Sequence, residues 1–218
     1  MDYLQIIILV AIWHFYHKSI KMFFPGTDNR SYANAVSITH SVIVTSMSTI
    51  FLFIGCEDEI TNGYLYLFSL TYFVYDLCNC LDDKLFIVHH LIGITILLSS
   101  SFFFTPEYSR YTNLMIIISE VTNPCQNFFF LMKNAYGENH KKEFYTRYMG
   151  LFVVFSTSFA VCRLLLAPLT IYLFISIIKE KIYYYTIFSC AILIIVGSAV
   201  WLKGQRNMIS KMKLMSKK

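Results

Sequence analysis

The sequence predicts an all-α membrane protein in which about seven transmembrane helices form one bundle. Hydrophobic residues make up 56% of the 218 residues and charged residues only 14%, a composition that a soluble domain of this length does not have. The apolar residues gather in runs long enough for a bilayer-spanning helix, which needs about 20 residues. The connections between the runs are too short to build a second core, so we expect a single bundle.

Seven apolar runs are expected to span the membrane, over residues 4–24, 36–55, 64–81, 85–104, 111–131, 148–176 and 182–202. The first run begins after Asp2 without a basic leader, which favours a retained span over a signal peptide. It is also the weakest of the seven, because its apolar part ends near Tyr16, so six spans is the alternative. In the long sixth run, Pro168 is expected to kink the helix.

Lys and Arg fall mainly on one side of the predicted membrane. The first side holds Lys18, Lys21, Arg30, Lys84, Lys133, Lys141, Lys142, Arg147 and the six basic residues after Leu202, whereas the other holds Arg110, Lys179 and Lys181. Because positive charge is retained in the cytoplasm, we expect a lumenal or outside N-terminus and a cytoplasmic C-terminus. The net charge of +5 then describes a surface near anionic lipid and not a nucleic-acid binder.

Cysteine and histidine spacing gives no reason to expect a metal. The six Cys lie within or at the ends of apolar runs without paired loop spacings, which argues against disulfides and zinc. His14 and His17 have the i, i+3 spacing of a chelating pair, but they flank Trp13, Phe15 and Tyr16 near a span end. We therefore expect those two histidines to lie at the membrane interface.

Polar side chains inside the predicted spans mark the candidate functional site, because such groups are costly in hydrocarbon unless they are used or satisfied. They are His40, Asp76, His89, His90, Glu120, Asn123, Asn127 and Arg163. From a rise of ~1.5 Å per residue, the first four lie roughly 8 Å below the cytoplasmic surface. Asn127 and Asn123 lie deeper, Glu120 lies near mid-depth, and Arg163 lies deepest. The set predicts a funnel that opens to the cytoplasm and that a lipid chain enters sideways.

The chemistry expected of this site is acid–base catalysis by histidine. Asp76 would accept a hydrogen bond from one ring nitrogen, fix the tautomer and raise the basicity of the other nitrogen. Such a His could deprotonate a hydroxyl or an amine for acyl transfer. Neighbouring helical residues point about 100° apart, so only one of His89 and His90 would face a substrate directly.

Purely structural roles are the alternatives at the same positions. His40 would be a hydrogen-bond partner between helices. Arg163 would pair with Glu120 so that two buried charges become tolerable. The His pair and Asp76 would form a buried polar contact without chemistry.

Four local patterns resemble the TLC (TRAM/LAG1/CLN8) domain family. They are RSYANAVSITHSV, YFVYDLCNCLDDKLFIVHHLIG, SEVTNPCQNFFFL and RLLLAP, and they follow one another from residue 30 onward. The resemblance implies an N-terminal transmembrane segment and connection over residues 1–29, a TLC domain over 30–212 and a basic cytoplasmic tail over 213–218. It also implies residence in the endoplasmic reticulum or a related endomembrane, or a host membrane if the chain is viral.

Within this family, the ceramide synthase branch uses paired His in acyl-CoA-dependent N-acylation of a sphingoid base, and the resemblance places that role on His89 and His90. That branch has two Asp spaced three apart where this chain has Glu120 and Asn123. The SEVTNP pattern is more similar to the small TLC-domain-containing proteins, which are linked to membrane phospholipid composition. No bound cofactor is implied, and acyl-CoA would be a co-substrate.

Four functions follow from these observations. The first is lipid metabolism or membrane-lipid homeostasis with His-dependent acyl transfer, and its narrower form is N-acylation of a sphingoid base. Another is binding of a lipid or cargo without turnover. A proton or ion transporter ranks lower, because the polar set opens to one face and paired broken helices are not evident. A receptor ranks lowest, because almost no outer segment could hold a ligand. Membrane lipids are the expected partners.

Overall fold

The computed structural model describes residues 3–23, 28–56, 58–79, 84–136 and 140–216, and in these residues helices are joined by short connections, without strands. Asp2, Lys217, Lys218 and the side chains of Arg30 and Lys141 lie outside the described set. The helices are α1 (Tyr3–Phe23), α2 (Asn29–Ile54), α3 (Glu59–Leu77), α4 (Lys84–Phe102), α5 (Pro106–Glu120), α6 (Asn123–Tyr136), α7 (Lys141–Ala160), the π-helical η2 (Val161–Leu166), α8 (Ala167–Ile177) and α9 (Lys181–Ser216).

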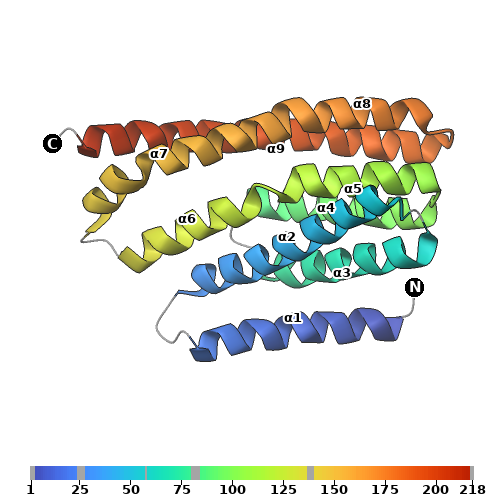
Figure 1. Ribbon diagram of the computed structural model, residues 1–218, viewed down its shortest axis with the longest axis horizontal. Helices are drawn as coiled ribbons and strands as arrows, with labels where there is room; N and C mark the ends of the chain where they lie inside the picture. The colour runs from blue at the N-terminus through green and yellow to red at the C-terminus, as the bar shows by residue number, and fades with distance from the viewer. Residues whose placement is uncertain (1–2, 24–27, 57, 80–83, 137–139, 217–218) are drawn as a thin grey trace.

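These helices form seven columns that run along the long axis of the bundle, because α5 continues into α6, and α7, η2 and α8 are continuous (Figure 1). Five described helices are long and apolar enough to cross a membrane: α1, α2, α4, the column over Lys142–Ile177, and α9. The predicted all-α, multi-pass fold is confirmed, and α1 qualifies as a span in its own right. The orientation of the termini across the membrane stays a prediction.

Two of the predicted runs differ from the observed helices. The fifth run is interrupted between Glu120 and Asn123, because Pro124 lacks an N–H and clashes with a preceding carbonyl in a continuous helix. The last helix extends well beyond 202, where the predicted span ends, and runs to Ser216. It continues because its final turns bury Met212 against Phe129 on α6 and Phe144 on α7.

The predicted kink in the sixth run takes the form of a π-helix. Residues Val161–Leu166 have π-helical hydrogen bonding directly before Pro168, and the column changes direction there (Figure 1). A π-turn accommodates the carbonyl that proline leaves without its usual donor. This turn also carries Arg163, which is buried, whereas Val161, Leu164 and Leu165 are exposed. The kink therefore brings the one basic side chain of this segment into the bundle.

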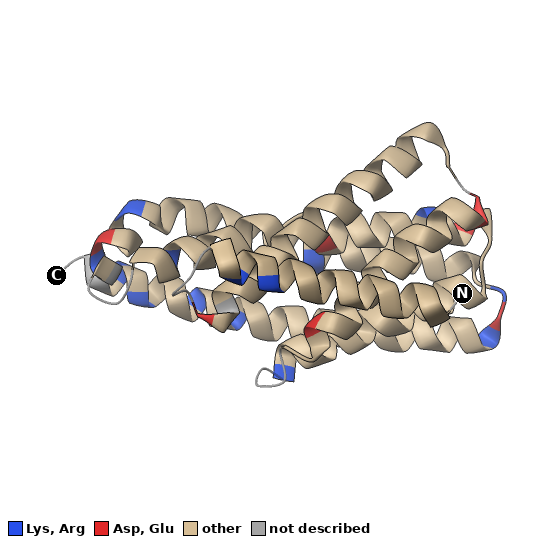
Figure 2. Ribbon diagram, turned by 90° about the horizontal axis from the view of Figure 1, so that it is seen from below, with Lys and Arg blue, Asp and Glu red and all other residues tan. Residues whose placement is uncertain are grey.

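Lys and Arg residues gather at the end of the bundle where the C-terminus lies, although the opposite end also carries some (Figure 2). At that opposite end, Asp58 caps the N-terminus of α3 by accepting from the backbone N–H of Thr61 at 2.7 Å. Asp58 also accepts from the Cys56 thiol at 3.0 Å, and these hydrogen bonds lower the pKa of Asp58 to about 2. The cap fixes the start of α3, the helix that carries Asp76.

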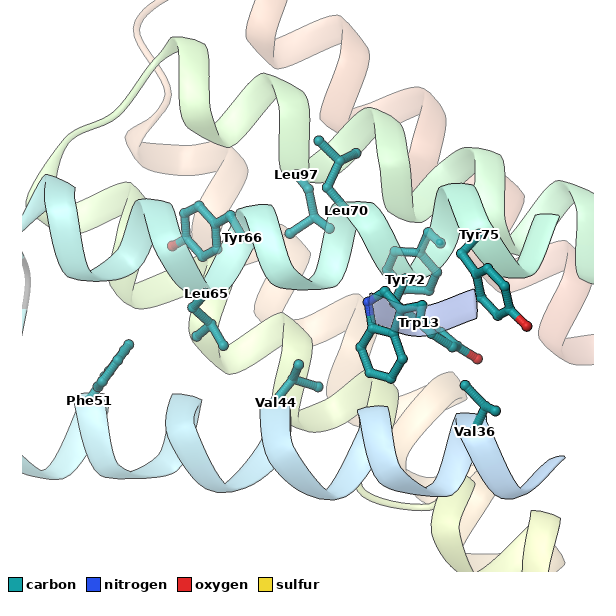
Figure 3. Packing of buried hydrophobic residues seen from close by; sticks show 11 residues of the cluster. Trp13, Val36, Val44, Phe51, Leu65, Tyr66, Leu70, Tyr72, Tyr75 and Leu97 are labelled. Atoms are coloured by element: carbon teal, nitrogen blue, oxygen red, sulfur yellow. The ribbon is translucent and has the colours of Figure 1, made fainter. Parts of the chain in front are cut away.

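Helix α1 lies at the edge of the bundle and packs against α3, the helix that carries Asp76. Trp13 is buried in the first hydrophobic cluster, next to Tyr72 on α3, with 5.4 Å between the two rings (Figure 3). The His17 ring forms a hydrogen bond with the Tyr75 hydroxyl. The Tyr16 hydroxyl forms another with the Thr39 hydroxyl, at 2.7 Å. His17 is thus buried within the bundle, whereas His14 is exposed, and their position at the membrane interface stays a prediction.

Candidate functional site

The structure brings the predicted polar residues together around two adjoining cavities. The polar chamber encloses about 830 Å³, its open mouth included, and is lined by Asp76, His89, His90, Glu120, Asn123, Asn127 and Arg163 among others. The apolar chamber encloses about 540 Å³ on the same basis, and His40 lines it. His89, Glu120 and Arg163 line both chambers and therefore lie at their junction.

His90 is held by hydrogen bonds at both ring nitrogens. Its Nε2 lies 2.9 Å from Asp76 Oδ2, and its Nδ1 lies 2.7 Å from the carbonyl oxygen of Phe86, one turn earlier on α4. Tyr72 donates to the same carboxylate oxygen at 3.2 Å. Because a carbonyl can only accept, Nδ1 of His90 must donate. This corrects one expectation: the second nitrogen of the His next to Asp76 is already used and is not free for a substrate.

His89 is the imidazole that faces the cavities. Among the described residues it has no hydrogen-bond partner, and its ring edge packs on Phe73 with 6.0 Å between the ring centres. Its position in the wall of both chambers follows from the 100° step that separates it from His90 on α4. The structure thus divides the pair into one fixed and one available histidine.

Glu120 is bound by neighbours other than Arg163. Its Oε2 accepts from the Ser41 hydroxyl at 2.6 Å and from Asn123 Nδ2 at 2.9 Å, and His40 Nδ1 lies 3.8 Å away. In the described part of the chain, Arg163 and Glu120 form no ion pair, and Arg163 Nη2 donates to the carbonyl of Ser119 instead. The structural alternative in which these two charges pair directly is therefore wrong.

His40 and Asn127 connect α2 to its neighbours in different ways. The His40 ring stacks on Tyr72 with 3.8 Å between centres and 13° between planes. Neither of its ring nitrogens has a hydrogen-bond partner in the described residues, so the expected role of His40 as a hydrogen-bond link between helices is wrong. Asn127 donates to the Ser37 hydroxyl at 2.8 Å and makes that kind of link between α6 and α2.

Several residues that sequence reasoning missed also line the polar chamber. They are Ser37, Tyr72, Phe73, Gln126, Phe159, Ser198 and Trp201. Tyr72 lies one helical turn before Asp76, and Gln126 lies between Asn123 and Asn127. Their spacing to these predicted site residues could have identified them from the sequence. Trp201 carried no such signal, because its helix is far from the others in sequence.

Cavities continue from the polar chamber in both directions along the bundle. Toward the C-terminal end, Leu85, Phe86, Asn127 and Trp201 also line a wider vestibule of about 1570 Å³, which is bordered by Asp28, Lys133, Asn134 and Gln205. In the other direction, the apolar chamber shares Ile96, Thr112, Met115 and Ile194 with a small cavity of about 260 Å³. The polarity of the lining therefore falls from the vestibule inward, as a lipid with a polar head and an apolar chain requires.

Gly93 is required by the close approach of Phe73. A Cβ at position 93 would lie 2.9 Å from Cε2 of the Phe73 ring, which is too close for two carbon atoms. Phe73 packs on both His89 and His90, so a displaced ring would shift them. We expect Gly93→Ala to lower stability by about 1–3 kcal/mol, as overpacking does.

The check on Gly93→Ala is thermal unfolding of the variant and the parent in nanodiscs. Gly150→Ala is the matched control, because a Cβ there would meet no atom within 4 Å. Equal behaviour of the two variants would contradict the prediction.

Seven helical columns around a buried set of histidine, carboxylate and guanidinium groups define the chain as a multi-pass integral membrane protein with a polar site inside its bundle. The chain belongs to the TLC domain family, whose model matches residues 31–203. The family predicted from the four local patterns is thereby confirmed. No curated protein and no solved structure matches the chain.

Proposed function

We propose that this protein transfers an acyl group to or from a membrane lipid, with His89 as the general base. The observation that carries the proposal is the position of His89. Its imidazole lies where the polar and apolar chambers meet and has no hydrogen-bond partner among the described residues. A base needs an accessible nitrogen within reach of the proton it removes, and the junction is where the head of a lipid chain would lie.

The reaction begins when the hydroxyl or amine of the acceptor attacks the carbonyl carbon of the acyl donor. As the new C–O or C–N bond forms, the acceptor proton passes to His89 and the carbonyl π electrons move to its oxygen. Collapse of this tetrahedral intermediate restores the carbonyl and breaks the bond to the leaving group, which takes the proton from His89. The base is thus regenerated in each cycle.

The remaining polar groups position this chemistry. The Asp76–His90 pair is fixed by the Phe86 carbonyl and the Tyr72 hydroxyl and forms an ordered polar wall beside His89. The vestibule at the predicted cytoplasmic end would admit a polar head or an acyl-CoA, and the apolar chamber would hold the chain. N-acylation of a sphingoid base is the narrower form of this proposal, and an endoplasmic reticulum location fits the family.

Binding of a lipid without turnover is the second candidate. The continuous series of cavities supports it, because a chain could be held there without any reaction. The two candidates differ in one respect: a binder needs the shape of the chamber, whereas an acyltransferase also needs a base at His89.

The test is lipid profiling of membranes from cells that express the parent chain, His89→Gln or His14→Gln at matched abundance. His14→Gln is the control, because His14 is exposed on α1 and lines none of these cavities. We expect one lipid class to change with the parent and with His14→Gln but not with His89→Gln. An unchanged profile in all three would contradict acyl transfer, and an equal change in all three would favour binding alone.

A further inference from the structure

Arg163 is a buried guanidinium with few partners. Its exposed fraction is 5%, and its Nη2 donates to the Ser119 carbonyl, but its Nε has no acceptor in the described residues. The nearby carboxylate of Glu120 is already bound to Ser41 and Asn123. Burying a charge costs several kcal/mol unless a direct ion pair compensates it, and Arg163 makes no direct ion pair within the described residues. The free protein therefore holds a cation that a bound anionic or partly anionic oxygen would stabilise.

A second donor without a partner lies in the same cavity wall. Gln126 on α6 is also 5% exposed, and its Nε2 has no acceptor among the described residues. Both side chains line the polar chamber, and Arg163 lines the apolar chamber as well. Two residues with unpartnered donors thus line one chamber, and the adjoining apolar chamber is suited to an aliphatic chain.

The local fold explains why Arg163 faces inward. It is carried by the π-helical turn η2, in which its neighbours Leu164 and Leu165 face outward. Single π-turns within α-helices are frequent at functional sites. The Arg163 guanidinium also lies 5.5 Å from the centre of the Phe159 ring, which limits its movement. The donor is therefore oriented before any ligand binds.

We propose that Arg163, together with Gln126, binds the carbonyl oxygen of the acyl group and stabilises the oxyanion that forms on it. This inference rests on the proposed acyl transfer and assigns the subsite for the acyl oxygen. In the step described above, the π electrons of the carbonyl move to this oxygen while the acceptor proton moves to His89, and both return on collapse. Donors already in place where charge develops are the most effective form of such stabilisation.

Binding of two lipid probes tests the subsite without any need for turnover. The probes are hexadecylphosphonate, which carries tetrahedral anionic oxygens at the head of its chain, and 1-hexadecanol, which has the same chain without the charge. The full chain in phosphatidylcholine nanodiscs should bind the phosphonate at least tenfold more tightly. Arg163→Leu should lose this preference while keeping its affinity for the alcohol, and Gln126→Leu should lose part of it.

The matched control is Ser48→Ala. Ser48 on α2 is buried and its hydroxyl also has no partner in the described residues, but it lines neither chamber nor the vestibule, so its loss should leave the preference unchanged. Thermal unfolding separates binding from structure. Loss of an uncompensated buried charge should leave the stability of Arg163→Leu equal or higher. Lower stability with equal loss of both probes would overturn the proposal.

The outcomes also separate this subsite from the proposed function. If acyl transfer is found, Arg163→Leu should reduce kcat by about 100- to 1000-fold with little change in KM. If the phosphonate preference depends on Arg163 but no lipid turns over, the anion subsite stands and acyl transfer fails. If turnover depends on His89 but not on Arg163 or Gln126, acyl transfer stands and the oxyanion subsite fails.

Discussion

His89→Ala is expected to reduce lipid turnover by about 100- to 10,000-fold, the range that loss of a general acid–base group gives. The reason is that the His89 imidazole lies at the junction of the two chambers and has no partner in the described protein. The same lack of a partner means that the fold does not depend on its nitrogens. The measurement is the initial rate with purified chain in nanodiscs, using the lipid class that profiling identifies.

Two further measurements make the His89 prediction specific. Thermal unfolding of His89→Ala should stay close to that of the parent, apart from a small loss of contact with Phe73. Lipid binding should also be retained, because a base acts on the reaction and not on the chain in the apolar chamber. Unchanged turnover in a folded His89→Ala protein would exclude this residue as the base.

His90→Ala is expected to affect stability, unlike His89→Ala. The expected loss of stability is about 3–5 kcal/mol, as found when one partner of a buried ionic pair is removed. The Asp76 carboxylate is 7% exposed and would lose its 2.9 Å contact with Nε2. The hydrogen bond to the Phe86 carbonyl would be lost as well. Chemical unfolding in mixed micelles would measure the difference between parent and variant.

A double variant distinguishes this explanation from simple loss of volume. Removing both partners in Asp76→Leu with His90→Leu leaves no orphaned charge, so it should restore most of the stability that His90→Ala loses. A double variant that is less stable than His90→Ala would show that packing, and not the buried charge, dominates at this site. His89 and His90 would then be predicted to differ in function and not through the stability effect of a buried charge.

The contrast between the two histidines also explains why a His–His pair is useful inside a bundle. One imidazole commits both nitrogens to Asp76 and Phe86 and holds the start of α4 against α3. The next residue is then placed at a defined angle into the cavity, so its orientation is set without hydrogen bonds of its own. An available base in an apolar setting needs this kind of support from its neighbours.

The sequence by itself determined the class of fold and eight polar residues of the candidate site. Runs of about 20 apolar residues predict membrane spans, because no other element satisfies its backbone in a bilayer as simply as a helix. Polar groups within those runs predicted His89, His90, Asp76 and five supporting residues, because each is too costly there to be incidental. The structure places all eight around two joined chambers.

Only the tertiary structure decided which partner each polar group takes. Hydrogen bonding depends on side-chain direction across helices, so the sequence could not show that His90 uses both nitrogens or that Glu120 binds Ser41 instead of Arg163. The break before Pro124 and the π-turn before Pro168 set those directions for Glu120 and Arg163. Composition and spacing place a residue at a depth, whereas helix packing and local backbone geometry decide what it faces.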